Sequence, residues 1–256
     1  MQFEVLGPLI VREADEHRFV SRPALRQLLS TMLLHANRTL KPDTLTRLLW
    51  DDHDFSRSTG AVRTNVWALR RALMPWQGLQ TIPSSGYRLA LNPGELDLDR
   101  FRTLARRGNE ALGHENYDGA LRLLREAARE WRDPPLSDVP PTRALEPVIV
   151  KLLGERQNAR HDLTEAQLAI GQHRSLVPDL LAETMESPSD EKNWAFLMVA
   201  LYRSGRRADA LDTFHRARSV LGENYGLDPG PSLLKLQSQM LADDPLLAGA
   251  ACRVIF

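Results

Sequence analysis

The sequence predicts an α+β domain over residues 1–92, an all-α domain over residues 96–242 and a tail over 243–256. In the first part, short apolar runs broken by Gly and Pro alternate with helical patterns, which is typical of mixed domains. After Leu96 the strand patterns vanish and apolar residues recur at helical spacing. With 43% hydrophobic residues among 256, the chain is long enough for two domains that each bury a core.

The first domain begins with short strands and two helices. Apolar runs over residues 3–11 and 18–20 predict a small antiparallel sheet. A helix is expected after Pro23, because the next apolar residues share one helical face. They are Leu25, Leu28, Leu29, Met32 and Leu33. Pro42 opens a second helix, which ends in the polar segment 51–54.

A third helix is predicted over residues 58–74, and its two faces differ in chemistry. The apolar face holds Val62, Val66, Leu69 and Leu73. The opposite face holds Gly60, Arg63, Thr64, Trp67 and Arg71. Arginine forks onto guanine or phosphate, so this face suits DNA, with Arg70 at its edge as a phosphate contact. The alternatives are an ordinary solvated face and, for Trp67, packing against the second domain.

A hairpin is predicted over residues 79–91, with its tip at Pro83 to Gly86. Two helices, a turn, an Arg-bearing helix and a hairpin form the order of a winged helix-turn-helix, which places a helix in the DNA major groove. The candidate DNA contacts outside the third-helix face are Arg57, Thr81, Ser84, Ser85 and Arg88.

This segment resembles the winged helix of OmpR-type response regulators. The resemblance lies in Leu69-Arg70-Arg71-Ala72-Leu73 and in the stretch from Thr81 to Gly86-Tyr87-Arg88. Many relatives carry an Arg in the wing after the Thr, where this chain has Ile82-Pro83. We therefore expect the wing residues to contact phosphates rather than to read the minor groove.

Charge and composition favour a nucleic-acid partner and exclude several other classes. Residues 1–92 carry 12 Lys or Arg against 8 Asp or Glu, whereas the remainder carries 21 against 25. A single cysteine, Cys252, and scattered histidines give no zinc spacing, so we expect neither metal nor cofactor. The sequence holds no long apolar run and no signal-peptide pattern, which predicts a cytoplasmic protein that does not enter a membrane.

The second domain contains repeats of the tetratricopeptide type. The clearest unit spans residues 193–222, and its fixed positions are occupied by Trp194, Leu197, Gly205, Ala210, Phe214 and Ala217. Two looser units precede it, and a Pro-rich insertion over residues 133–147 separates them. Such all-α arrays bind proteins, and the open alternative is a rigid dimerisation or spacer domain.

Nearly the whole chain resembles the SARP class, the Streptomyces antibiotic regulatory proteins, in which an OmpR-like winged helix precedes a bacterial transcriptional activation domain. The resemblance is carried by Phe3 to Gly7 with Leu9, Arg70 to Leu73, Gly86-Tyr87, Ala200 to Leu211, Arg216-Ala217-Arg218 and Gly226 to Pro231. Larger relatives append ATPase or sensor domains, so residues 243–256 look like a tail or the stump of a longer chain.

The resemblance implies an activator of antibiotic biosynthetic genes that binds promoter direct repeats as a dimer and recruits RNA polymerase. In such proteins the loop before the third helix faces the polymerase sigma subunit and the neighbouring core surfaces. In this chain that loop supplies Asp51, Asp52 and Asp54 as candidate polymerase contacts. The alternative is an ordinary solvated loop.

An enzyme is not predicted. The chain has no P-loop, GxGxxG, GxSxG or HExxH motif, and His35, His53 and His161 are isolated in the sequence. The rival to a DNA-binding activator is a tetratricopeptide-like protein-interaction adaptor whose winged helix docks a protein.

Overall fold

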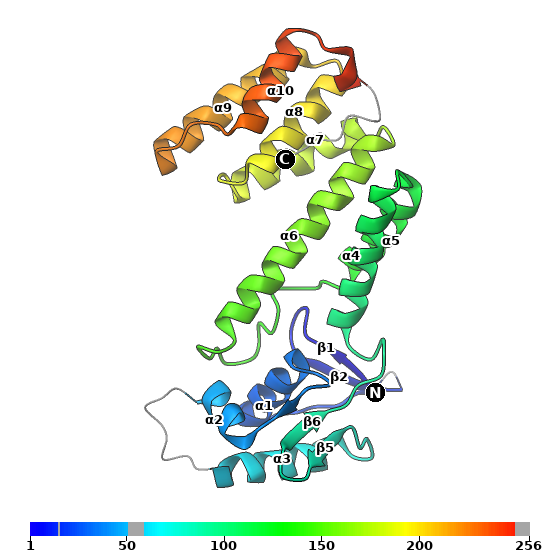
Figure 1. The fold of residues 1–256 in the computed structure, drawn as a ribbon, viewed down its shortest axis with the longest axis vertical. Helices are drawn as coiled ribbons and strands as arrows, with labels where there is room; N and C mark the ends of the chain where they lie inside the picture. The colour runs from blue at the N-terminus through cyan, green and yellow to red at the C-terminus, as the bar shows by residue number, and fades with distance from the viewer. Residues whose placement is uncertain (15, 51–58, 249–256) are drawn as a thin grey trace. The chain divides into compact units, whose positions relative to one another are not determined.

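The computed structural model describes residues 1–14, 16–50 and 59–248, and it confirms the predicted succession of an α+β part and an all-helical part (Figure 1). The elements of the first part are β1 (Gln2–Glu4), β2 (Ile10–Glu13), β3 (Glu16–His17), α1 (Pro23–Leu34), β4 (Thr39–Leu40), α2 (Pro42–Leu49), α3 (Thr59–Leu73), β5 (Leu79–Ile82) and β6 (Gly86–Leu89).

Two small antiparallel sheets frame the three helices of this part. The first has the order β1-β2-β3 and the second the order β4-β6-β5. The prediction of a strand over residues 18–20 is wrong in its position. The strand β3 lies at Glu16–His17 instead and pairs with the end of β2. Phe19 is consequently 88% exposed rather than part of the sheet.

The helices α1, α2 and α3 pack against one another through the apolar faces that the sequence predicts. Val62, Val66, Leu69 and Leu73 of α3 are each at most 1% exposed. Proline stands at the first turn of α1 and α2, where its missing N–H costs no helical hydrogen bond. The arrangement is a helix-turn-helix in which one face of α3 remains outside the core.

From Asp97 onward the described chain forms helices joined by loops, without strands. Its elements are α4 (Asp97–Gly113), α5 (Tyr117–Arg129), α6 (Glu146–Ala169), α7 (His173–Glu186), α8 (Glu191–Arg203), α9 (Arg207–Tyr225), α10 (Pro231–Leu241) and the short η2 (Pro245–Ala248). The predicted tetratricopeptide pair of residues 193–222 corresponds to α8 and α9. Gly108 shows why such repeats need small residues, since a Cβ there would lie 2.5 Å from Leu124 Cγ.

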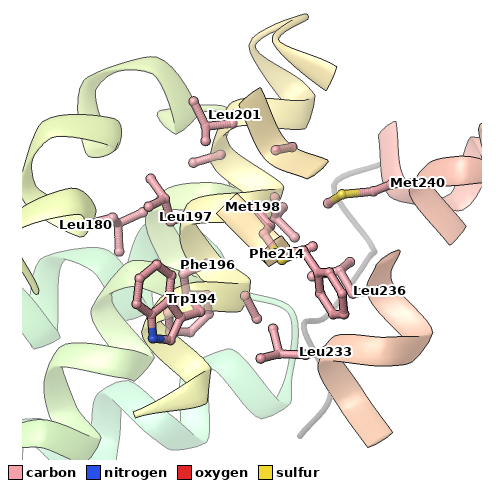
Figure 2. Packing of buried hydrophobic residues seen from close by; sticks show 14 of the residues in the cluster. Leu180, Trp194, Phe196, Leu197, Met198, Leu201, Phe214, Leu233, Leu236 and Met240 are labelled. Atoms are coloured by element: carbon pink, nitrogen blue, oxygen red, sulfur yellow. The ribbon is translucent and has the colours of Figure 1, made fainter. Parts of the chain in front are cut away.

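The core of the C-terminal helices is centred on α8, in which every residue from Asn193 to Leu201 is buried. A helix buried all round is the central element of its layer. Trp194 and Phe196 belong to the same apolar cluster as Phe214 of α9 and Leu233 of α10 (Figure 2). This core fixes α7 to α10 as one compact helical group.

The motif Gly226 to Pro231 connects α9 to α10. Gly226 ends α9 in the left-handed conformation, with φ of 66°, and Pro231 starts α10 at its first turn. Between them Gly230 donates its N–H to Glu191 of α8 at 2.8 Å. The motif that carries much of the family resemblance therefore has a structural role in joining three helices.

The chain forms two compact units that do not coincide with a cut between residues 92 and 96. One unit contains residues 1–106 and 126–157, and the other contains residues 107–125 and 158 onward. The predicted domain boundaries, 1–92 and 96–242, follow sequence patterns rather than compact units, and they stay a prediction. In the first unit, the helix-turn-helix shares its compact body with the start of α4 and with the Pro-rich insertion.

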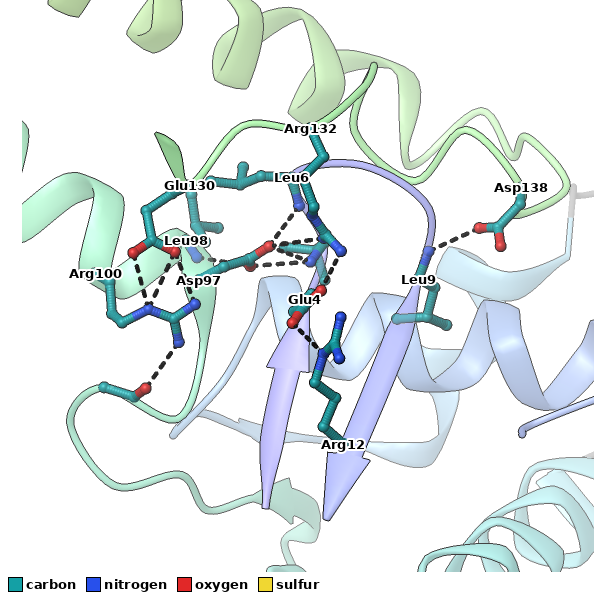
Figure 3. A network of polar contacts seen from close by, with 12 residues as sticks. Glu4, Leu6, Leu9, Arg12, Asp97, Leu98, Arg100, Glu130, Arg132 and Asp138 are labelled. Atoms are coloured by element: carbon teal, nitrogen blue, oxygen red, sulfur yellow. Dashed lines mark hydrogen bonds and ion pairs between the residues drawn. The ribbon is translucent and has the colours of Figure 1, made fainter. Parts of the chain in front are cut away.

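A buried carboxylate joins the segment after β1 to α4 within this first unit (Figure 3). Asp97 accepts hydrogen bonds from the backbone N–H groups of Val5, Leu6 and Leu98 at 2.8–2.9 Å, and it pairs with Arg132 at 3.4 Å. Burial raises the pKa of Asp97 from 3.8 to about 6, although the three N–H donors and Arg132 act in the opposite direction.

The Pro-rich insertion adds further bonds to the same N-terminal hairpin. Leu136 donates its N–H to the carbonyl oxygens of Val5 and Gly7, at 3.1 and 2.7 Å. Asp138 accepts from the N–H of Leu9 at 2.8 Å and forms an ion pair with Arg26 of α1. The insertion thus braces both the first sheet and the first helix of the helix-turn-helix.

Candidate nucleic-acid interface

The exposed face of α3 presents the residues that the sequence assigns to DNA. Arg63, Thr64, Trp67 and Arg71 are all exposed, opposite the buried Val62, Val66, Leu69 and Leu73. The separation of the two faces follows from the 3.6-residue period, which places residues 63, 64, 67 and 71 on one side. The structure therefore brings four of the predicted contacts together on one helical surface.

Trp67 and Arg71 form a stacked pair on this surface. The indole of Trp67 is 61% exposed, and the guanidinium carbon of Arg71 lies 5.7 Å from its ring centroid. A cation over an aromatic face is attracted by the ring quadrupole, so the stack restricts where Arg71 points. Thr64 donates its hydroxyl to the carbonyl oxygen of Gly60 at 3.1 Å, which leaves its methyl group and oxygen lone pair on the surface.

Arg70 lies at the edge of this face and has partners inside the molecule. Its Nε donates to the carbonyl oxygen of Leu79 at 2.8 Å, and its Nη2 donates to Thr81 Oγ1 at 2.6 Å. Figure 1 shows α3 beside the β5–β6 hairpin that contains both acceptors. Helical periodicity places residue 70 around the helix axis but carries no information about β5, so the sequence did not reveal these two bonds.

The wing is the β5–β6 hairpin, as predicted. Its tip presents Ser84 and Ser85 as exposed residues, and the Ser85 N–H donates to the carbonyl oxygen of Ile82 at 3.0 Å. Gly86 has φ of +124°, and a Cβ there would lie 2.1 Å from the carbonyl oxygen of Leu40. Arg88 lies in β6, the central strand, and its buried Nε has no hydrogen-bond partner among the described residues.

Four predicted contacts lie outside the described residues. They are the DNA candidate Arg57 and the polymerase candidates Asp51, Asp52 and Asp54.

The buried histidine of α6, His161, serves a structural role. Its Nε2 lies 3.1 Å from Asn193 Oδ1 of α8 and 3.1 Å from Oδ2 of Asp190, the residue that caps α8. No group of three or more His, Cys, Asp or Glu side chains in the described ranges is placed to hold a metal ion. Among the helices of those same ranges, none combines the length and the apolar character needed to cross a membrane.

A winged helix with an exposed Arg-bearing third helix, followed by helical repeats, defines a two-part transcriptional regulator. Residues 18–89 match the family described as "Transcriptional regulatory protein, C terminal", and residues 96–241 match "Bacterial transcriptional activator domain". The chain belongs to the SARP class of bacterial transcriptional regulators, which combines these two regions.

The relatives are named as regulatory proteins. The transcriptional regulatory protein EmbR of Mycobacterium tuberculosis is 31% identical over 96% of this chain and 64% of its own length. Regulatory protein AfsR of Streptomyces coelicolor is 35% identical over 97% of this chain and 25% of its own length, and DnrI of Streptomyces peucetius is 28% identical over 96% and 93%.

The fold also matches a solved structure. The structure of Mycobacterium tuberculosis EmbR in complex with a low-affinity phosphopeptide has a TM-score of 0.90 and 30% identity, over 95% of this chain and 65% of that one. The chain therefore spans less than two thirds of the length of EmbR.

Proposed function

We propose that this chain is a sequence-specific DNA-binding activator of transcription that inserts α3 into the major groove. The single observation that carries the proposal is the exposed face of Arg63, Thr64, Trp67 and Arg71 on a helix whose other face is fully buried. A major groove admits one helix, and arginine recognises guanine through two hydrogen bonds. A solvated surface helix has no need of an exposed tryptophan, whereas a DNA-reading helix can use its ring against sugars and thymine methyl groups.

Charge supports the same proposal. Residues 1–92 have an excess of four basic residues, and the remainder has an excess of four acidic residues. A basic module next to an acidic one favours DNA binding by the first and keeps the second away from the phosphates.

The finer proposal follows the family. The chain binds direct repeats in promoters of antibiotic biosynthetic genes as a dimer and recruits RNA polymerase through its sigma and core subunits. Protomers arranged head to tail on repeats one helical turn apart would occupy the same side of the DNA. Asp51, Asp52 and Asp54 remain the proposed polymerase contacts, because their negative charge suits a basic partner surface.

Fluorescence anisotropy with duplex DNA from the promoters beside its own gene tests the proposal. Specific binding should weaken steeply with added salt, because phosphate contacts release counterions. The Arg71→Ala and Arg63→Ala variants should each lose about 1–3 kcal/mol of binding free energy if their guanidinium groups recognise bases. Arg218→Ala is the matched control, because this exposed arginine of α9 lies far along the chain from α3.

The outcome also separates DNA binding from the rival adaptor function. The observation that favours the adaptor is Trp67 itself, because an exposed indole beside arginine is also a frequent protein-binding anchor. Unchanged affinity of both α3 variants for DNA, together with a flat salt response, would favour protein docking by this face.

A further inference from the structure

Arg70 differs from the two arginines on the exposed face of α3. Arg63 and Arg71 are exposed, whereas Arg70 is half-buried and donates to two acceptors of β5. The two bonds leave from Nε and Nη2, which lie in one rigid plane. Because a planar fork with two partners fixes orientation as well as distance, this side chain locks β5 against α3.

The strand that Arg70 holds controls the position of the wing. β5 is an outer strand in the sheet order β4-β6-β5, and among the described strands it pairs with β6 alone. Thr81 lies opposite Tyr87 in this ladder, four positions before the tip residue Ser85. A bond from α3 to Thr81 therefore sets the placement of the wing relative to the recognition helix.

Thr81 retains a donor that its bond with Arg70 does not use. Its Oγ1 accepts the Nη2 hydrogen of Arg70, so the hydroxyl proton of Thr81 is directed elsewhere. Thr81 is exposed. A hydroxyl that accepts from a cation is polarised and becomes a better donor toward an anion, and a DNA phosphate is the anion beside a wing.

We infer that Arg70 is a positioning residue, which holds the wing against α3 and orients the Thr81 hydroxyl toward a DNA phosphate. This replaces the expectation that Arg70 itself contacts a phosphate, and it rests on the proposed DNA-binding function. The observation behind it is the pair of bonds to Leu79 and Thr81.

The salt dependence of binding distinguishes positioning from direct contact. A direct phosphate contact retains most of its effect when Arg is replaced by Lys, because the point charge remains. Positioning requires the fork, so Arg70→Lys should weaken DNA binding about as much as Arg70→Ala, by about tenfold, as expected for the loss of one or two hydrogen bonds. In Arg70→Ala the slope of log K against log salt should equal that of the wild type, because a positioning residue releases no counterion of its own.

Arg71 is the matched comparison. Arg71→Ala should reduce the magnitude of the salt slope by about 0.9 if its charge releases one counterion. Near-wild-type affinity of Arg70→Lys together with a reduced slope in Arg70→Ala would overturn the positioning role and restore the phosphate contact.

The Thr81 hydroxyl is tested by a second pair of variants. Thr81→Ser keeps the acceptor and the donor and should bind DNA like the wild type, whereas Thr81→Val loses both and should bind about tenfold more weakly. The double variant Arg70→Ala with Thr81→Val should be no weaker than either single variant, because both act through one contact. Additive losses of DNA affinity would contradict the view that Arg70 and Thr81 act through one contact.

A measurement without DNA keeps the inference separate from the proposed function. Hydrogen exchange of the β5 amides, Leu79 to Ile82, should be faster in Arg70→Ala, while the amides of α9 stay unchanged. If the wild type binds no DNA but β5 exchanges faster in Arg70→Ala, the proposed function fails and the positioning of β5 by Arg70 remains. If β5 exchange is unchanged in Arg70→Ala, the positioning role of Arg70 is wrong, whatever the DNA measurements give.

Discussion

The pKa of Asp97 shifts upward, in the direction opposite to that of most structural carboxylates. Salt-bridged acids usually have a lowered pKa, but burial raises the pKa of Asp97 to about 6. The folded chain thus binds a proton more tightly than the unfolded chain, in which the pKa is 3.8. The stability linked to Asp97 is fully present below about pH 4 and is lost as the pH rises through about 6.

Denaturant unfolding of the wild type and of Asp97→Asn across pH 4 to 7 measures this effect. The amide does not titrate, so the free energy of unfolding of the wild type relative to the variant should fall by about 2–2.5 kcal/mol over that range. A relative stability that rises with pH, or that does not change, would contradict the raised pKa. At neutral pH the charged form still keeps three N–H donors satisfied, which an asparagine cannot do.

Gly86 is the residue whose replacement the wing tolerates least. Its φ of +124° strains any side chain, and a Cβ would lie 2.1 Å from the carbonyl oxygen of Leu40. Gly86→Ala should reduce the free energy of unfolding by about 1–3 kcal/mol or more, as measured by denaturant titration. Gly113→Ala is the control, since a Cβ at that helical position would meet no atom within 4 Å beyond its own chain neighbours and helix backbone. Equal effects of the two substitutions would argue against the strain at Gly86.

At the scale of elements, periodicity predicted most of the fold. The starts of α1 and α2 follow from Pro23 and Pro42, and the buried side of α3 follows from apolar residues repeating every three or four positions. The hairpin at residues 79–91 follows from Gly and Pro punctuation. These signals are local, so a single sequence contains them in full.

Contacts between segments that are distant in the chain could not be predicted from the sequence. The Pro-rich insertion reads as a break in a helical array, yet its Leu136 and Asp138 bond to residues about 130 positions earlier. Arg70 reads as a surface arginine, yet it bonds to β5. No periodic pattern encodes which segments meet, because such meetings depend on the tertiary fold as a whole.

The brace from the insertion to α1 gives a prediction at this scale. Asp138→Ala removes the acceptor of the Leu9 N–H and the partner of Arg26, whose side chain is 18% exposed. We expect a loss of about 1–3 kcal/mol in the free energy of unfolding, measured by chemical denaturation. Asp228→Ala should have little effect, because that carboxylate is 89% exposed and lies 3.9 Å from Arg218. A neutral Asp138→Ala would mean that the insertion does not support the helix-turn-helix.

For the whole molecule, the proposed dimer on direct repeats has a geometric consequence. Two protomers on repeats about 10–10.5 base pairs apart lie on one face of the duplex. An insertion of about 5 base pairs turns the second repeat to the opposite face and should abolish cooperative binding without changing the affinity for one repeat. Titrations of the two DNA lengths, followed by anisotropy and by band shift, check this. Equal cooperativity on both would contradict a dimer held by protein contacts.

The helices α4, α5 and α6 each belong partly to one compact unit and partly to the other, so the chain crosses between the units three times. Under the proposed function, promoter specificity is therefore not exchangeable by joining two genes at residue 92. A graft of a foreign winged helix at that point would meet an insertion whose Leu136 and Asp138 are shaped for the original hairpin. A working chimera must transfer the insertion, residues 133–147, together with the donor's winged helix. Under the proposed function, new DNA specificities are expected to arise by point changes on α3 rather than by exchange of the whole winged helix.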